Sequence, residues 1–197
     1  MNLTKVAVCI TGASGVIYGL ELVKALKKHV NCYVYLIISR WGWTVMKHEA
    51  SRKLIDEVFS IVDEYYPEDE LDAPIASGSS CPDAVIVCPC SIKTLSSIVQ
   101  AHCENLIVRA VIVALKQGRQ VILVIRETPL TKHIIELMMK AADMGIHIVP
   151  ACPGFYHKPE SINDIVKFVV GKVLEILNIR HDMYRPWRMM SGHGSDK

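Results

Sequence analysis

Apolar residues in this chain form short continuous runs that are separated by longer stretches of mixed polarity. The runs lie at residues 5–10, 32–38, 84–89, 120–125 and 146–150. Because each run is continuous rather than alternating, it predicts a strand buried on both faces, as in a parallel sheet covered by helices. Helices are expected between the runs, at 16–28, 41–57, 92–102, 105–117, 131–144 and 162–178, with a capping arrangement at 161–164 opening the last. The pattern therefore predicts a doubly wound α/β domain with helices on both sides of a parallel sheet.

Two segments interrupt this pattern. The acidic, proline-containing stretch 63–80 is expected to leave the sheet, and residues 180–197 indicate an irregular tail. We expect one domain over 1–180 and a C-terminal tail over 181–197, and both interrupting segments are candidates to cover a site. The helix at 105–116 is apolar nearly all round, so one face is expected to meet the sheet and another a neighbouring subunit.

Composition narrows the range of partners. Of the 197 residues, 51% are hydrophobic and 21% are charged, and the mean hydropathy of +0.27 favours extensive contacts between subunits. Arg109 and Lys116 interrupt the longest apolar runs before they reach membrane-spanning length. A net charge of +2 without a cluster of basic residues does not indicate a nucleic-acid partner. Small molecules and further copies of the chain are the expected partners.

The N-terminus and the cysteines bear on location and metal binding. The chain enters its first strand at once, which leaves no room for a secretion signal, so a cytoplasmic protein is expected. Seven cysteines, an odd number, suit reduced thiols better than a disulfide framework. Cys81, Cys88 and Cys90 lie close in sequence, but no histidine is near them to complete a metal shell. They are expected to be buried small residues, and no metal site is predicted.

The sequence TGASGVIYG at 11–19 follows the first predicted strand and opens a helix, a position where many α/β proteins bind a phosphate. Its glycines do not have the spacing of the dinucleotide fingerprint, and Ser39 follows the second strand where NAD enzymes usually carry an acidic residue. Arg40 leaves an NADP site open, but none of the seven tyrosines has the lysine that short-chain reductases need four residues later. A tight turn without a ligand is the alternative.

A second loop of the same kind, CPCSIKTLSS, follows the strand at 84–89 and places Ser91 and Thr94 at the start of a helix. A simple helix cap explains Ser91 fully. Two hydroxyl-rich turns on neighbouring strands nevertheless favour a mononucleotide such as FMN, although spacing alone does not separate FMN from other phosphorylated ligands.

Several motifs resemble the UbiX-type flavin prenyltransferases, a flavodoxin-like branch of Rossmann-type flavoproteins once described as aromatic acid decarboxylase subunits. They are TGASGVIYG, IASGSS (75–80), CPCSIKTL (88–95), ENLIVRAVIVALKQGR (104–119), VIRETPL (124–130) and the segment from PGFYHKPE (153–160) to residue 179. The resemblance covers about Lys5 to Trp187. It implies that the domain 1–180 binds FMN and that dimethylallyl phosphate alkylates reduced FMN at N5 and C6. It also implies that a UbiD-type decarboxylase receives the product and that the chain forms a homo-oligomer, by family resemblance a dodecamer.

The resemblance also implies roles for individual residues. FMN contacts are expected from Gly12, Ala13, Ser14, Ser39, Ser91, Ile92, Lys93, Thr94 and Arg126. Dimethylallyl phosphate is expected at Tyr156 and Lys172, with Lys116, Arg109 and Glu127 close by, in part from adjacent subunits, and Trp187 near the prenyl group. Family members often carry arginine where this chain has Lys172, and lysine lacks the bidentate fork of arginine.

These residue types suit the reaction. Breaking the carbon–oxygen bond of an allylic phosphate leaves negative charge on the phosphate, which Lys116, Lys172 and a tyrosine hydroxyl would stabilise. An aromatic face such as that of Trp187 or Tyr156 would stabilise the allyl cation. Glu127 would take the proton from C6 or hold the released phosphate that does so. The catalytic set expected is therefore Glu127, Lys116, Tyr156 and Trp187, without a metal ion.

Other functions compete with this one. FMN-dependent cysteine decarboxylases share the flavin loops, but they carry a histidine before the strand at 84–89 and a Met-Asn substrate motif. This chain has no histidine there and no Met-Asn pair after Met1-Asn2. A decarboxylase acting directly on hydroxybenzoates would need an acid that the sequence does not supply. An FMN carrier or accessory subunit is the remaining alternative, although a carrier needs no pocket that stabilises a cation.

Overall fold

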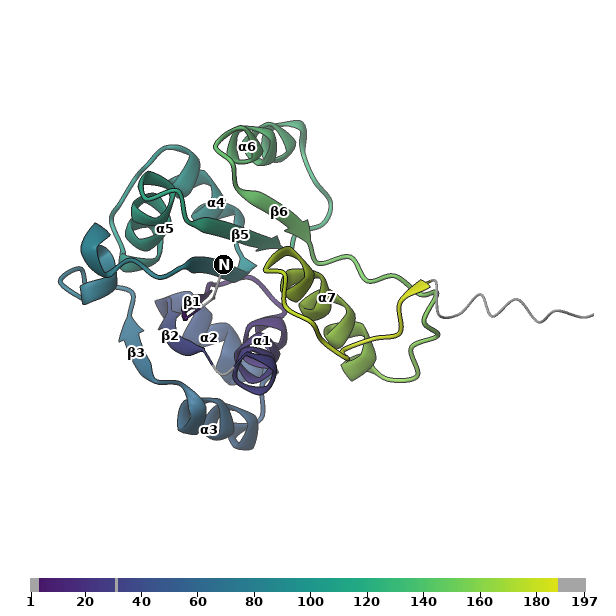
Figure 1. The fold of residues 1–197 in the computed structure, drawn as a ribbon. Coiled ribbons are helices and arrows are strands. Elements are labelled where there is room, and N and C mark those ends of the chain that lie inside the picture. The colour runs from purple at the N-terminus through teal and green to yellow at the C-terminus, as the bar shows by residue number, and fades with distance from the viewer. Residues whose placement is uncertain (1–3, 31, 188–197) are drawn as a thin grey trace, which may run out of the picture.

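The computed structural model describes residues 4–30 and 32–187, and within them six strands form one parallel sheet (Figure 1). The strands are β1 (Lys5–Ile10), β2 (Tyr33–Ile38), β3 (Glu64–Pro67), β4 (Ala84–Cys90), β5 (Gln120–Ile125) and β6 (His147–Pro150). Their order is β3-β2-β1-β4-β5-β6, and every pairing is parallel. This confirms the predicted doubly wound sheet, and the order reverses between β1 and β4.

Helices cover both faces of the sheet. They are α1 (Val16–His29), α2 (Arg40–Glu49), α3 (Arg52–Ile61), α4 (Ile92–Val99), α5 (Leu106–Lys116), α6 (Lys132–Asp143) and α7 (Ile162–Ile176). Successive β1 residues point to opposite sides: Val6 and Val8 pack with α1, α2, α3 and α7, whereas Ala7 and Cys9 pack with α4, α5 and α6. This alternation within a continuously apolar strand is the reason the sheet has two cores.

Helix α7 begins with the capping box expected at 161–164. The Ser161 hydroxyl accepts a hydrogen bond from the Asp164 backbone amide at 3.2 Å, and the Asp164 carboxylate accepts one from the Ser161 amide at 3.0 Å. The loop before α7 (151–161) and the segment after it (177–187) project together from one side of the body (Figure 1). We call these two segments the arm. The remainder of the predicted tail, 188–197, lies outside the described residues.

The structure corrects the single helix expected over 41–57. Helix α2 ends at Glu49, and Ser51 begins α3 by accepting a hydrogen bond from the Leu54 amide at 3.3 Å. Ala50 and Ser51 are both extended, so the chain changes direction between the two helices. The apolar periodicity continues through this break, which is why the sequence pattern did not reveal it; the serine cap was the available signal.

The segment 63–80 was also expected to leave the sheet, and this is wrong for its first residues. Glu64–Pro67 form the edge strand β3, which pairs with β2 on one side only. Short, polar edge strands lack the apolar run that marks a central strand. Two 3₁₀ turns follow, Pro74–Ala76 and Gly78–Ser80, and Ile75 is fully buried against the core that contains α5.

These two 3₁₀ turns also correct the expectation that one face of α5 meets a neighbouring subunit. Nearly all of its apolar residues are buried within the protomer, and the Arg109 guanidinium Nε donates to the Ala76 carbonyl at 3.2 Å. The second apolar face of α5 therefore meets the 74–80 segment of its own chain rather than requiring a neighbouring subunit. Apolar side chains are exposed elsewhere, including Ile135 and Met139 on α6, which are 53% and 57% exposed.

No helix within the described parts of the chain is long and apolar enough to cross a lipid bilayer.

Candidate active site

A single buried hydroxyl joins the loops that follow β1 and β4. The Thr11 Oγ1 donates to the Pro89 carbonyl at 2.7 Å and accepts from the Ser91 amide at 2.8 Å. Thr11 is 1% exposed and stands directly after β1. The two loops therefore meet at the position where the strand order reverses, which is where ligands bind in open α/β sheets.

A cavity of about 170 Å³ opens beside these loops. The residues lining it are Gly12, Ser39, Trp41, Glu68, Ser91, Lys93, Thr94, Ser97, Asn105 and Val108. Ser39, Ser91 and Asn105 are the N-cap residues of α2, α4 and α5. Three helix N-termini thus border one small polar cavity, and their dipoles favour negative charge there. The Glu68 carboxylate supplies one such charge at the start of α2, where it accepts from the Arg40 amide at 2.7 Å.

The serine hydroxyls act as helix caps and keep a donor for a ligand. Ser39 Oγ accepts from the Gly42 amide at 2.9 Å, and Ser91 Oγ accepts from the Thr94 amide at 3.3 Å. The capping role and the binding role are compatible, because capping uses a lone pair and leaves the hydroxyl proton to be donated. Ser91 Oγ also lies 3.0 Å from Thr94 Oγ1. These hydroxyls and the Lys93 ammonium have the chemistry that an FMN phosphate requires.

The N-terminus of α1 carries an anion supplied by the protein. The Glu49 carboxylate accepts hydrogen bonds from the Gly15 amide at 2.7 Å and the Val16 amide at 3.2 Å. Sequence reasoning missed Glu49, because it lies more than thirty residues away at the end of α2 and nothing local marks it. Glu49 thus occupies these two amides at the start of α1. The helix starts that border the small cavity are those of α2, α4 and α5.

Arg126 links a third strand to the first loop. Its Nε donates to the Ser14 carbonyl at 3.1 Å, so the residue after β5 is tied to the loop after β1. Arg126 and Glu127 also line a second cavity, of about 350 Å³, which extends to Cys152 and Pro153 at the start of the arm. The exposed Glu127 carboxylate accepts from the Thr128 amide at 3.0 Å. This cavity therefore joins the Arg126 side of the site to the arm.

Aromatic rings gather on the arm around Phe168 of α7. The Tyr156 ring meets the rings of Phe168 and Trp187 edge to face, with centroids 5.7 and 5.4 Å apart. His157 stacks on Phe168 at 5.2 Å. The Lys172 ammonium lies 5.5 Å from the centroid of Phe168. Phe168 therefore brings two of the predicted residues together, Tyr156 and Lys172, and Trp187 joins them through its contact with Tyr156.

The other predicted residues fall into two groups. Gly12, Ser39, Ser91, Lys93 and Thr94 border the small cavity, with Ala13, Ser14 and Ile92 in the same loops and Arg126 bound to Ser14. Lys116 ends α5, just before β5 begins, whereas Glu127 follows the end of β5. Lys116 and Glu127 thus lie at opposite ends of β5 within one protomer. Arg109 is exposed on α5 beside Ala76.

The cysteines carry no sign of a disulfide or a metal shell in the described residues. All seven have free thiols, and Cys88 and Cys90 are buried as expected, while Cys81 is half-buried. Burial raises the pKa of the Cys88 and Cys90 thiols far above the usual range, so they stay protonated. In residues 4–30 and 32–187, no group of three or more histidine, cysteine or acidic side chains is placed to hold a metal ion.

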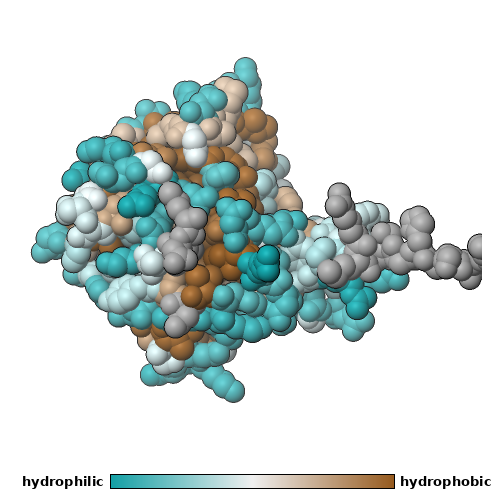
Figure 2. All heavy atoms as spheres, in the orientation of Figure 1, coloured by the Kyte–Doolittle hydropathy of each residue, from teal (hydrophilic) through white to brown (hydrophobic). Residues whose placement is uncertain are grey.

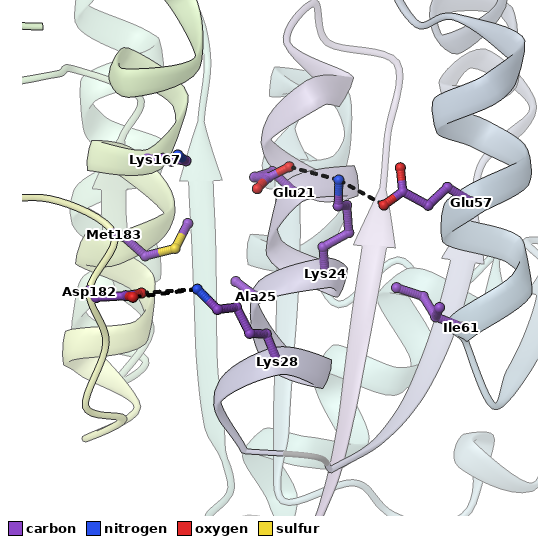
Figure 3. A pocket seen from close by; sticks show the side chains of 9 residues that line it. All are labelled: Glu21, Lys24, Ala25, Lys28, Glu57, Ile61, Lys167, Asp182 and Met183. Carbon is purple, nitrogen blue, oxygen red and sulfur yellow. Dashed lines mark hydrogen bonds and ion pairs between the residues drawn. The ribbon is translucent and has the colours of Figure 1, made fainter.

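A larger cavity, of about 360 Å³, lies between α1, α3 and the segment after α7 (Figure 3). Two of its three lysines are paired with acids: Lys24 Nζ is 3.0 Å from Glu57 Oε1, and Lys28 Nζ is 3.3 Å from Asp182 Oδ1 (Figure 3). These are solvated ion pairs that join α1 to α3 and to the segment after α7. None of the residues expected to bind FMN or the prenyl donor lines this cavity.

Comparison with known proteins agrees with this arrangement. The Flavoprotein family profile matches residues 1–174. The flavin prenyltransferase UbiX of Methanocaldococcus jannaschii is 44% identical over 185 residues, which cover 93% of this chain and 98% of that protein. Over 93% of this chain and 97% of the other, the fold matches the crystal structure of AnUbiX in complex with FMN and dimethylallyl pyrophosphate, with a TM-score of 0.88 and 32% identity. A dodecameric FMN-dependent UbiX-like decarboxylase from Escherichia coli O157:H7 matches with a TM-score of 0.88 and 37% identity, over 93% and 99% of the two chains. The chain belongs to the UbiX flavin prenyltransferase family of flavoproteins.

Proposed function

We propose that this protein is a flavin prenyltransferase that joins the dimethylallyl group of dimethylallyl phosphate to N5 and C6 of reduced FMN. The observation that carries the proposal is that the Tyr156 ring contacts both Phe168 and Trp187 while the Lys172 ammonium lies beside Phe168, since this places aromatic faces and a cation together. The family membership and the complex of the relative AnUbiX with FMN and dimethylallyl pyrophosphate support it.

The residues beside the small cavity fit FMN. Ser39, Ser91, Lys93 and Thr94 would hold its phosphate, and the Gly12–Ser14 loop and Arg126 would hold the rest of the molecule, with Ile92 beside them. Bound reduced FMN supplies the nucleophilic N5 and C6 atoms. The Arg126 guanidinium is held by the Ser14 carbonyl, so the loops after β1 and β5 are fixed relative to each other where the ring system would lie.

The residues on the arm and on α7 fit the prenyl donor. Lys172 and the Tyr156 hydroxyl would bind the phosphate and stabilise its charge as the carbon–oxygen bond breaks. The faces of Trp187 and Tyr156 would stabilise the allyl cation by cation–π attraction, worth about 2 kcal/mol when water is excluded. Glu127 would remove the C6 proton or hold the phosphate that does so.

Lys116 and Arg109 are proposed to reach the donor from a neighbouring subunit, because Lys116 and Glu127 lie at opposite ends of β5 in one protomer. A dodecamer like that of the relative from Escherichia coli is the proposed assembly. In Figure 2 apolar residues reach the surface in a band across the body, and Ile135 and Met139 of α6 are exposed, which supports contact between copies. The location is proposed to be cytoplasmic, and the recipient of the product a UbiD-type decarboxylase.

The direct test is anaerobic incubation of the protein with reduced FMN and dimethylallyl phosphate, followed by mass analysis of the extracted flavin. A mass gain of one five-carbon unit is the expected result, and it should persist in the presence of a metal chelator. Unmodified flavin would refute the proposal if dimethylallyl diphosphate also failed as the donor.

The site residues are tested by Glu127→Gln and Tyr156→Phe. Each is expected to slow formation of the prenylated flavin at least about tenfold, since each removes a group that acts on the reacting atoms or the leaving phosphate. Tyr33→Phe is the matched control, because it also removes a tyrosine hydroxyl, from one bonded to Glu64 at the amino end of β2. Wild-type rates in both site variants would remove Glu127 and Tyr156 from the catalytic set.

A further inference from the structure

The Lys172 ammonium is held by groups of its own chain. Its Nζ lies 2.9 Å from Glu175 Oε2, one turn further along α7. The Tyr184 hydroxyl, from the arm, donates to the other oxygen of the same carboxylate. The ammonium also lies 5.5 and 5.1 Å from the ring centroids of Phe168 and Tyr184. A carboxylate and two aromatic rings therefore define the position of this one cation.

Tyr184 reaches this position because residue 171 is glycine. A Cβ at Gly171 would lie 2.6 Å from Cε1 of Tyr184 and 3.0 Å from Cε1 of His181. Gly171 is buried in the middle of α7, where glycine weakens a helix relative to alanine. Close approach of the arm to α7 accounts for a residue that helix propensity disfavours at this position.

We propose that Glu175 and Tyr184 are positioning residues that hold Lys172 where it binds the phosphate of the prenyl donor, and that Gly171 makes room for them. This inference rests on the proposed function of the arm. A lysine is a flexible point charge that loses rotamer freedom when it binds an anion, and fixing it beforehand reduces that loss. An ammonium has three donors, so the bond to Glu175 leaves donors for a phosphate.

The charges of the cluster agree with this arrangement. Partial burial alone would lower the pKa of Lys172, but its hydrogen bonds to Tyr184 and Glu175 outweigh burial, and the pKa is raised. Burial would likewise raise the pKa of Glu175, but the bonds from Tyr184 and Lys172 lower it. Burial and the bond to Glu175 raise the pKa of Tyr184 to about 12. At neutral pH the lysine is charged, the carboxylate is charged and the phenol keeps its proton.

The test is Tyr184→Phe, which removes the hydroxyl, retains the ring over the ammonium and changes no charge. Loss of one hydrogen bond to a charged group is expected to raise KM for dimethylallyl phosphate about fivefold to tenfold. The inhibition constant of inorganic phosphate should rise in parallel, while kcat stays within about twofold and the FMN dissociation constant is unchanged. Tyr33→Phe, whose hydroxyl bonds another glutamate, should change none of these quantities.

A purely structural role for Tyr184 predicts a different result. The ring would then anchor the arm without the hydroxyl, and Tyr184→Phe would leave KM for the donor at the wild-type value. That result overturns the inference when wild-type protein prenylates FMN. If wild-type protein fails to modify FMN with either prenyl donor, the proposed function fails and the inference fails with it.

Gly171→Ala provides a second route to the same contact, because the added methyl group displaces Tyr184 without altering a polar atom. It is expected to raise KM for the donor as Tyr184→Phe does. In a Tyr184→Ala background the two closest contacts of the added methyl group are gone and only His181 Cε1 at 3.0 Å remains, so Gly171→Ala should add less than about twofold to KM. Equal effects of Gly171→Ala in the two backgrounds would show that the substitution acts through the helix and would overturn the assigned role of Gly171.

Discussion

Replacing Thr11 by valine removes the hydroxyl that joins the loops after β1 and β4, while the side chain keeps nearly the same shape. In the wild-type protein that hydroxyl accepts from the Ser91 amide at 2.8 Å and donates to the Pro89 carbonyl at 2.7 Å. The carbonyl retains a second partner, because the Thr11 amide also donates to it at 3.3 Å. The Ser91 amide loses its acceptor.

The energetic cost of Thr11→Val comes mainly from the Ser91 amide, because the Pro89 carbonyl keeps one hydrogen bond. The Ser91 amide is partly buried, and a buried amide left without a partner costs about 1–3 kcal/mol, whereas a carbonyl that keeps one of two bonds loses less. We expect Thr11→Val to lower the free energy of unfolding by about 2 kcal/mol. Because Ser91 begins α4 and borders the cavity assigned to the FMN phosphate, the dissociation constant for FMN should rise up to about tenfold.

Urea unfolding at fixed protein concentration and FMN titration measure the two effects. The matched control is Thr44→Val, whose hydroxyl donates to the Arg40 carbonyl within α2 at 3.2 Å and is exposed. The control should change the free energy of unfolding by less than about 0.5 kcal/mol. Wild-type stability in Thr11→Val would refute the energetic reasoning. Reduced stability with wild-type FMN affinity would show that the hydroxyl stabilises the fold without shaping the site.

Two further predictions concern the packing of α1 and the titration of the arm. Gly19→Ala would place a Cβ 2.2 Å from the Cys88 carbonyl oxygen, so α1 must move off the sheet, and urea unfolding should show a loss of about 3 kcal/mol in the free energy of unfolding. Gly118→Ala is the control, because a Cβ there would meet open space and only the positive φ of 64° costs energy. A loss for Gly19→Ala no larger than that of the control would contradict this prediction. Burial lowers the pKa of His181 below its ordinary 6.5 despite the nearby Glu175, so the unfolded chain takes up the proton first and stability should fall as the pH drops below 6.5. His181→Gln should reduce that fall in urea midpoints measured between about pH 7.5 and 5.5, and an unchanged fall would assign it to other groups.

The sequence was sufficient for the central strands and for the edge strand β6, and insufficient at the other edge, β3. A parallel strand in the middle of the sheet is covered by helices on both faces and must be apolar on both. The runs that became β1, β2, β4 and β5 were therefore recognisable from composition alone. Strand β3 has one neighbour and carries Glu64, whose carboxylate accepts hydrogen bonds from the Tyr33 hydroxyl of β2 and from the Tyr66 hydroxyl of the same strand. Its stability comes from contacts distant in sequence, which a local pattern does not contain.

Local sequence patterns likewise identified some residues of the candidate active site and missed others. Ser39 and Ser91 could be predicted because each follows a strand and begins a helix, a combination that reports both position and chemistry. Glu68 and Asn105 could not. They meet at the small cavity because the Asn105 amide donates to the Glu68 carboxylate at 3.0 Å, and Glu68 in turn accepts from the Arg40 amide at 2.7 Å. The starts of α2 and α5 are joined by this contact between segments that local rules treat separately.

The position of Lys116 bears on how many chains make one site. Strand β5 has six residues, which span roughly 20 Å, and it separates Lys116 at its amino end from Arg126 and Glu127 at its carboxyl end. A lysine side chain is too short to cover that distance within one protomer. If Lys116 and Glu127 serve the same donor molecule, they must therefore come from different subunits, and the exposed apolar residues of α6 and the projecting arm are the surfaces available for that contact.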